Sequence, residues 1–459
     1  MSTTGADTAK AAGRGGLAIA AAKVSFMVFG AAQTVLLTHL LGVSRFGDLQ
    51  HVLIPLNFVN NVVVGSSIQG VSHAVSSAPS EAAPAAYARV LRLHAALAVA
   101  VGALFALAAP VVARFLEAEE ATAELRLMAI VVVLYGLYAP IVGSLNGARR
   151  FGAQAGLDVT YQVLRTAALA IGALLLGVPG ALVGFGVAAA AIVPIALARA
   201  GIGRRGDDGS STRAYGAYFA PLFAGQVALN LLMASDITLL SHFAGVAATA
   251  LGRGKEDAAT LVGAYKNAQL FSFLPYQFLL SVSFVLFPML AKARSEKDAG
   301  AVASFTRAGI RLALVFTGLV CSVVSGLAPH LLRFAFPKPA YELAGDALRV
   351  LSLGMGAFAV LGITSTALAS VGRSGLGALL NAAAVVLIAG GCVAFVPHAA
   401  FGPEMLLHTA IATSAALFAT ALVGAILLRR ENGAFVAPAT VVRVGAALAV
   451  SVAVGARMP

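Results

Sequence analysis

Two charged residues lie inside apolar stretches, where an ionisable group is costly and points to a function. Asp236 lies in LNLLMASDITLL and Lys266 lies in LVGAYKNAQLF. A charge at the centre of a bilayer costs about 2.5–3.5 kcal/mol on insertion scales. An acid at such a depth can couple a process to a cation or a proton, and a lysine can hold an anionic group. Each is predicted about 10 Å from the end of its helix, on consecutive antiparallel helices, so a structural ion pair is the other open interpretation.

A second polar set has helical spacing. Asp158, Gln162 and Arg165 stand at i, i+4 and i+7, which places them on one face of a helix. A face that carries both signs of charge cannot point at lipid, so it must face other helices or water. We take Arg165 as a substrate-binding candidate and Asp158 and Gln162 as its polar support.

A run of asparagines follows the first inter-helix break. Asn57, Asn60 and Asn61 precede Gly65, Ser66, Ser67, Gln69 and His73. Asparagine and serine can join helices at about 0.6 kcal/mol per contact, but so many on one helix also suit the lining of a hydrated cavity. We name Asn57 and Asn61 as cavity candidates.

Three further cations complete the candidate set. Lys23, Arg307 and Arg311 lie within apolar helices but near their ends, where a long side chain can reach the interface. A substrate role stays open for them. The eight histidines are scattered, and the sequence shows no metal-ligand cluster and no nucleotide-binding glycine loop, so neither a metal nor a cofactor is predicted.

The elements that position these residues follow from composition. Of 459 residues 59% are apolar, and only 11% are charged, against roughly 25% in soluble proteins. Apolar runs of 20 to 30 residues indicate membrane-spanning helices, and shorter alternating segments typical of a barrel are not seen. The predicted class is an all-α polytopic membrane protein. The two cysteines lie in apolar runs, which argues against a disulfide framework.

The run boundaries give twelve helices and an apparent thirteenth. The expected spans are 15–42, 47–76, 86–114, 124–148, 153–177, 179–201, 215–243, 259–291, 302–335, 343–371, 375–397, 404–428 and 436–455. A polar, glycine-rich stretch, GIGRRGDDGSSTR, separates six helices from the next six. We therefore predict a six-helix lobe over 1–201, a cytoplasmic linker at 202–214, a second six-helix lobe over 215–430 and an additional apolar segment at 431–459.

Basic residues orient the chain. With the N-terminus inside, sixteen Lys and Arg fall on the cytoplasmic side and eight outside, where Glu117, Glu119, Glu120 and Glu124 gather. This asymmetry predicts a cytoplasmic N-terminus. The net charge of +12 then reflects a basic face against anionic lipid, and no nucleic-acid partner is needed.

The two halves carry a weak internal repeat. RFGDLQHVLIP and LVGAYKNAQLFSFLP, about 216 residues apart, each have a hydrophobic–Gly pair, then polar positions, then a proline (Pro55 and Pro275). LNGARRFG and LASVGRSGL, about 223 residues apart, form a second pair. Repeats of nearly constant offset are typical of transporters with two pseudo-symmetric lobes.

These motifs resemble a known superfamily. HLLGVSRFGDLQ is similar to the opening signature of polysaccharide transporters, and VGAYKNAQLFSFLPYQFLLSVSFVLFPMLAKA resembles their eighth helix, with Asp236 matching an acid often seen in the seventh. The resemblance covers nearly the whole chain and points to the Wzx-type oligosaccharide flippases of the multidrug/oligosaccharidyl-lipid/polysaccharide exporter superfamily. These have twelve or fourteen helices, so the apparent thirteenth is a departure.

The resemblance implies two six-helix bundles in a V that work by alternating access in the bacterial inner membrane. The cargo would be an undecaprenyl-diphosphate-linked oligosaccharide, with membrane lipids and polysaccharide polymerase or glycosyltransferase machinery as partners. A lipid II flippase and a cation-coupled multidrug exporter remain alternatives, although such exporters carry an acid in the first helix, where this chain has Lys23. Loops of at most about 13 to 15 residues leave no room for the extramembrane site of a glycosyltransferase or polymerase, so an enzyme is not expected.

Overall fold

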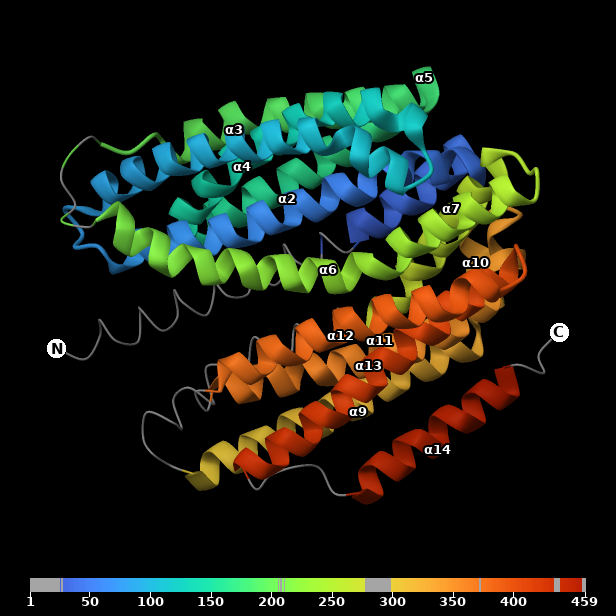
Figure 1. The fold of residues 1–459 in the computed structure, drawn as a ribbon. Helices are drawn as coiled ribbons and strands as arrows, with labels where there is room; N and C mark the ends of the chain where they lie inside the picture. The colour runs from blue at the N-terminus through green and yellow to red at the C-terminus, as the bar shows by residue number, and fades with distance from the viewer. Residues whose placement is uncertain are drawn as a thin grey trace. The chain divides into compact units, whose positions relative to one another are not determined.

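The computed structural model describes residues 25, 28–204, 206, 209, 211–276, 299–370, 373–432 and 438–455. Regular structure in these ranges is helical, as Figure 1 shows. After the helix Val28–Leu41 come α2 (Val43–Ser77), α3 (Ala83–Phe115), η1 (Glu119–Ala121), α4 (Thr122–Gly147), α5 (Phe151–Ala200), α6 (Thr212–Ala250), α7 (Lys255–Ser272), α9 (Ala299–Gly326), α10 (Ala328–Ala335), α11 (Ala340–Ser370), α12 (Ser374–Phe395), η2 (Val396–His398), α13 (Pro403–Asn432) and α14 (Pro438–Gly455). The predicted all-α class is confirmed.

The helices have the length and composition of membrane spans. Within the described ranges nine are long and apolar enough to cross a bilayer. One of these, α5, is two helices joined at Gly177, whose φ of 65° and ψ of −139° are not helical. Glycine adopts this backbone without a Cβ penalty, and the break matches the predicted boundary between 153–177 and 179–201. The protein is a multi-pass membrane protein.

Two predicted boundaries were wrong. The expected span 302–335 is divided, because α9 ends at Gly326 and the short helix α10 begins at Ala328. The expected end near Phe243 is also too early, since α6 continues to Ala250 and the loop before α7 is only 251–254. Four of the seven extra residues, AGVAATA, are alanines, which prolong a helix readily.

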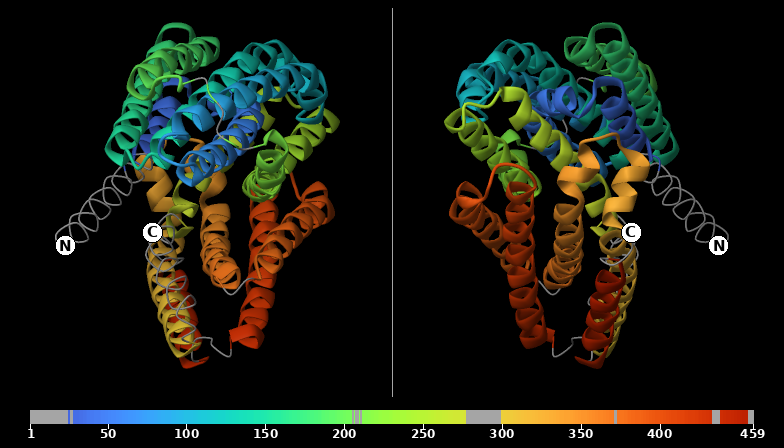
Figure 2. Two further views of the ribbon diagram at one scale, coloured as in Figure 1. Left: turned by 90° about the vertical axis from the view of Figure 1, so that its left-hand side faces the viewer. Right: turned by 90° about the vertical axis from the view of Figure 1, so that its right-hand side faces the viewer.

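The chain divides into two compact units that share two helices. Unit 1 holds the described residues up to Leu41 together with His51–Asn230, and unit 2 holds Gly42–Gln50 and Leu231 onward. The divisions fall inside α2 and α6, so each of these helices begins in one unit and ends in the other. Within each unit the long helices lie alongside one another (Figure 2).

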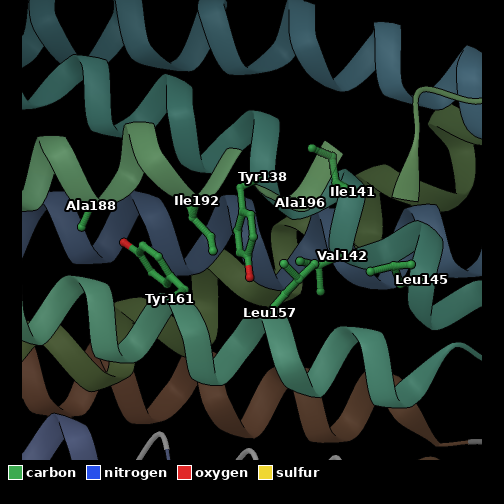
Figure 3. Close-up of a cluster of buried hydrophobic side chains, with 9 residues drawn as sticks. All are labelled: Tyr138, Ile141, Val142, Leu145, Leu157, Tyr161, Ala188, Ile192 and Ala196. Atoms are coloured by element: carbon green, nitrogen blue, oxygen red, sulfur yellow. The ribbon is translucent and has the colours of Figure 1, made fainter. Parts of the chain in front are cut away.

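The core of unit 1 lies between α4 and the two halves of α5. Leu157 and Tyr161 of α5 meet Tyr138 and Ile141 of α4 and Ile192 of the second half of α5, and all are buried. Figure 3 shows these side chains filling the space between the helices. The tyrosine rings are thus held in place by apolar neighbours on two helices.

Unit 2 is built around α11, which packs against α7, α9, α12 and α13. The terminal helix α14 packs on α9, where Val444 and Ser451 lie next to Gly318 and Gly326. The apparent thirteenth helix of the sequence is therefore a packed element of unit 2.

The repeated hydrophobic–Gly pairs meet in unit 2. A Cβ added to Gly47 of α2 would collide with the Ala259 carbonyl of α7, and one added to Gly263 of α7 would collide with the Val43 carbonyl of α2. Ser44 also donates a hydrogen bond to the Glu256 carbonyl, at 3.3 Å. The two glycines, 216 residues apart, therefore allow equivalent backbones to touch.

Candidate functional site

A buried carboxylate lies inside unit 2. Asp236 of α6 is 1% exposed, and it accepts hydrogen bonds from the Tyr265 hydroxyl at 2.9 Å, the Gln269 amide at 3.2 Å and the backbone N–H of Ile237 at 2.7 Å. Tyr265 and Gln269 stand at i and i+4 on α7, so both reach the same side of that helix. Such donors stabilise a buried carboxylate that would otherwise be expensive.

Lys266 is connected to this carboxylate through Gln269. Its Nζ donates to Gln269 Oε1 at 3.1 Å, while Gln269 Nε2 donates to Asp236. The structure brings Asp236 and Lys266 together as the sequence suggested, with an amide between them. We call Asp236, Tyr265, Lys266 and Gln269 the acid network.

The acid network lies deeper along its helices than the sequence suggested. Asp236 is fourteen residues before the end of α6 and Lys266 is eleven residues after the start of α7. These separations correspond to about 21 Å and about 16 Å, not about 10 Å. The late end of α6 is the reason for Asp236, and the early start of α7, at Lys255 instead of residue 259, is the reason for Lys266.

The polar face of α5 lies against α4 in unit 1. Gln162 is 2% exposed, and Asp158 and Arg165 are half-buried. The Arg165 guanidinium carbon lies 4.5 Å from the centre of the Phe185 ring, and the charge interacts with Tyr135. This face therefore looks into the unit and carries aromatic neighbours.

The α2 asparagines differ in environment. Asn60 is 2% exposed and neither atom of its amide has a hydrogen-bond partner, whereas Asn57 is half-buried and Asn61 is exposed. Farther along α2, Ser72 donates to Asn146 of α4 at 2.7 Å, and Asn146 donates to Gln154 of α5 at 2.8 Å. At least one polar side chain of α2, that of Ser72, thus takes part in hydrogen bonds that link α2, α4 and α5.

A buried histidine connects three helices of unit 1. His94 of α3 is 2% exposed. It is hydrogen-bonded through Nδ1 to the Ser67 hydroxyl of α2 at 3.0 Å and through Nε2 to the Tyr215 hydroxyl of α6 at 2.6 Å. Because Tyr215 lies in the first turn of α6, the histidine holds the start of that helix against α2 and α3.

Replacing His94 with alanine is expected to destabilise the protein. The change leaves the buried Ser67 hydroxyl without its partner, at about 1–3 kcal/mol for a buried group, and it removes the anchor of the half-buried Tyr215 hydroxyl. A melting experiment on detergent-purified protein measures this. His73→Ala is the control, because exposed His73 only stacks on Tyr218, at 3.9 Å between ring centres. An equal fall in melting temperature in both variants would show that the hydrogen bonds of His94 do not stabilise the protein.

The remaining predicted cations are placed as follows. Arg307 and Arg311 are exposed on α9 in unit 2, and Arg307 Nε donates to the Ala303 carbonyl at 3.3 Å. Lys23 lies outside the described residues. Within the part of the chain that is described, no group of three His, Cys, Asp or Glu could hold a metal ion.

Sequence reasoning missed several of these residues. The partners of His94 are 27 and 121 residues away, so no local spacing connects them. Tyr135 lies on a helix separate from Arg165 and has no motif of its own. Tyr265 and Gln269 could have been found, since their i, i+4 spacing flanks Lys266.

Comparison with known proteins gives the family. The sequence profile of the family described as "Polysaccharide biosynthesis protein" matches residues 12–294, which is more than half of the chain. No curated protein matches the sequence.

Solved structures give the fold. The chain is similar to a lipid II flippase, MurJ, in an inward closed conformation, with a TM-score of 0.75 and 15% identity over 95% of this chain and 90% of that one. It is also similar to an inward-facing multidrug resistance MATE family transporter of the MOP superfamily. The TM-score is 0.72, with 16% identity over 88% of this chain and 94% of that one. A third similar structure is that of a MOP superfamily transporter from Pyrococcus furiosus. Its TM-score is 0.66, and the two sequences are 16% identical over 91% of this chain and 95% of that one.

The profile match and the shared fold agree with the resemblance that the motifs suggested. The chain belongs to the polysaccharide biosynthesis protein family, and its fold is similar to those of a lipid II flippase and of MOP superfamily transporters.

Proposed function

We propose that the protein is a flippase that moves an undecaprenyl-diphosphate-linked oligosaccharide from the cytoplasmic to the periplasmic leaflet of the bacterial inner membrane. The product would serve the synthesis of a surface polysaccharide such as lipopolysaccharide. Membership of the polysaccharide biosynthesis family is the observation that carries this proposal. The similarity in fold to a lipid II flippase agrees with a lipid-linked cargo.

The polar residues inside the helices suit such a cargo. A diphosphate and a chain of sugars cannot cross hydrocarbon unaided, because each unsatisfied polar group there is costly. Half-buried Arg165, in the membrane-span candidate α5 of unit 1, and half-buried Lys266, on α7 of unit 2, offer cations among the packed helices. Lys23, Arg307 and Arg311 add further candidates.

Alternating access is the mechanism that we propose. The contact between Gly47 and Gly263 joins the starts of two repeat-related helices without side chains between them. Such a contact can open and close with little repacking, which suits a gate. The distribution of Lys and Arg favours a cytoplasmic N-terminus, and polysaccharide polymerases or glycosyltransferases are the partners expected on this pathway.

Asp236 is our candidate for coupling transport to a cation or a proton. Its donors come from two helices, α6 and α7, so a change in its charge alters the contact between them. Lys266, joined to it through Gln269, can transmit that change to an anionic cargo.

Gene deletion with complementation tests the proposed function. Cells that lack the gene should lose the surface polysaccharide and accumulate its lipid-linked precursor. The wild-type gene should restore export, whereas Arg165→Ala and Lys266→Ala should restore it poorly although the proteins insert. Thr160→Val, at an exposed position of α5, is the control. Normal surface polysaccharide in the deletion strain, with lipid II accumulating instead, would refute this cargo and favour the lipid II flippase.

A further inference from the structure

Aromatic and polar side chains are combined in one place in unit 1. We call Tyr135, Tyr138, Asp158, Gln162 and Arg165 the tyrosine–arginine site. The Tyr161 hydroxyl donates to the Tyr135 hydroxyl, with ring centres 5.3 Å apart, and Tyr138 lies 5.6 Å from Tyr161. Figure 3 shows the Tyr138 and Tyr161 rings beside Leu157 and Ile192, which hold them in position.

Two donors on the α5 side of this site have no hydrogen-bond partner, and neither does the Tyr138 hydroxyl of α4. The Gln162 amide nitrogen and the Arg165 Nε are both buried atoms without an acceptor, and Gln162 as a whole is 2% exposed. A buried donor without a partner costs free energy comparable to that of the hydrogen bond it fails to make. Two such donors one turn apart on α5 therefore point to an acceptor that a ligand supplies.

The site is partly exposed. Tyr135, Asp158 and Arg165 are each half-buried, so they reach the surface of the packed helices, while Gln162 and Tyr138 are buried. The polar atoms from Asp158 to Arg165 span seven residues of α5, which is about 10 Å along the helix. This length accommodates one or two sugar rings.

The chemistry of the site suits the sugars of the cargo better than its diphosphate. A diphosphate is an acceptor with two or more negative charges, and Asp158 would repel it. A sugar presents hydroxyl groups that both donate and accept, together with a C–H face that packs against aromatic rings. Asp158 can accept from such hydroxyls, Gln162 and Arg165 can donate to them, and the tyrosines can provide the flat contact.

We propose that the tyrosine–arginine site binds the carbohydrate part of the lipid-linked cargo and so contributes to the choice of glycan. This inference rests on the proposed flippase function. It assigns the diphosphate to other cations of the protein, and it makes Gln162 and Arg165 direct contacts of sugar oxygens.

A binding comparison with two probes tests the assignment. The full-length protein in detergent is titrated with undecaprenyl diphosphate, and separately with the lipid-linked glycan extracted from cells in which the gene is deleted. Wild type should bind the glycan-bearing lipid more tightly. Gln162→Met and Arg165→Lys should each reduce that preference roughly tenfold, the effect of one lost hydrogen bond to a charged or buried group, and leave the affinity for undecaprenyl diphosphate unchanged. Thr160→Val, on the exposed side of α5, is the matched control.

The outcomes are distinguishable. An equal loss of affinity for both probes would mean that the site holds the diphosphate, and a full glycan preference in both variants would mean that it holds no part of the cargo. Either result overturns the assignment while the flippase function stands. Arg165→Lys keeps the charge and limits misfolding, and a melting curve for each variant identifies a folding defect. Failure of wild type to bind either probe would overturn the proposed function and this inference with it.

Discussion

Gly47→Ala is expected to abolish export of the surface polysaccharide. The added Cβ would lie well within van der Waals contact of the Ala259 carbonyl carbon and oxygen, and backbone atoms cannot rotate away as a flexible side chain does. Overpacking of this kind costs about 1–3 kcal/mol, so the state in which α2 and α7 touch becomes roughly five- to 150-fold less populated. If that contact closes one side of the pathway, transport stops.

Matched alanine substitutions isolate this effect. Alanine is a better helix former than glycine by about 1 kcal/mol, so any loss at Gly47 is steric. A Cβ at Gly156 of α5 meets nothing within 4 Å, and Gly156→Ala should export normally. Gly263→Ala should behave as Gly47→Ala does, because its Cβ would meet the Val43 carbonyl. Normal export by both contact variants would show that the glycine contact is not a gate.

Asp236→Asn and Asp236→Leu are expected to have different effects. Leucine removes the acceptor for Tyr265 and Gln269 and leaves the Lys266 charge without its negative counterpart, and breaking a buried charge network in this way costs about 3–5 kcal/mol. Asparagine keeps a carbonyl acceptor of the same size, so the protein should fold. If Asp236 couples transport to a cation, the asparagine variant should lose the dependence of flipping on the ion gradient.

Proteoliposomes with and without an imposed proton or sodium gradient measure this dependence. Gln269→Glu is a useful companion, since it adds a second acid beside Asp236 and should weaken the network without removing its acceptor. An asparagine variant that responds to the gradient as wild type does would leave Asp236 with a structural role only.

The helices were predictable from sequence to different degrees. The break in α5 at Gly177 could be placed because glycine and Pro179 interrupt an apolar run. The end of α6 could not, because AGVAATA carries neither a charge nor a proline to mark a boundary. The division of 302–335 was missed although Gly326 and Pro329 flank the break, which is the same kind of signal that Gly177 and Pro179 give in α5.

The candidate site was predictable only within single helices. The face of Asp158, Gln162 and Arg165 follows from 3.6-residue periodicity, and the structure shows it turned toward other helices. The tyrosines that accompany Arg165 come from α4, and the partners of His94 come from α2 and α6. These contacts depend on how helices pack, which one sequence does not encode in a readable spacing.

The helix α6 connects two polar sites along the chain. It runs without interruption from Thr212 to Ala250, although unit 1 ends at Asn230. The Tyr215 hydroxyl, bonded to His94, lies in its first turn, and Asp236 lies six residues beyond Asn230, about 9 Å farther along the helix axis. A substitution that unwinds α6 between these residues would therefore disturb the surroundings of both the histidine and the carboxylate.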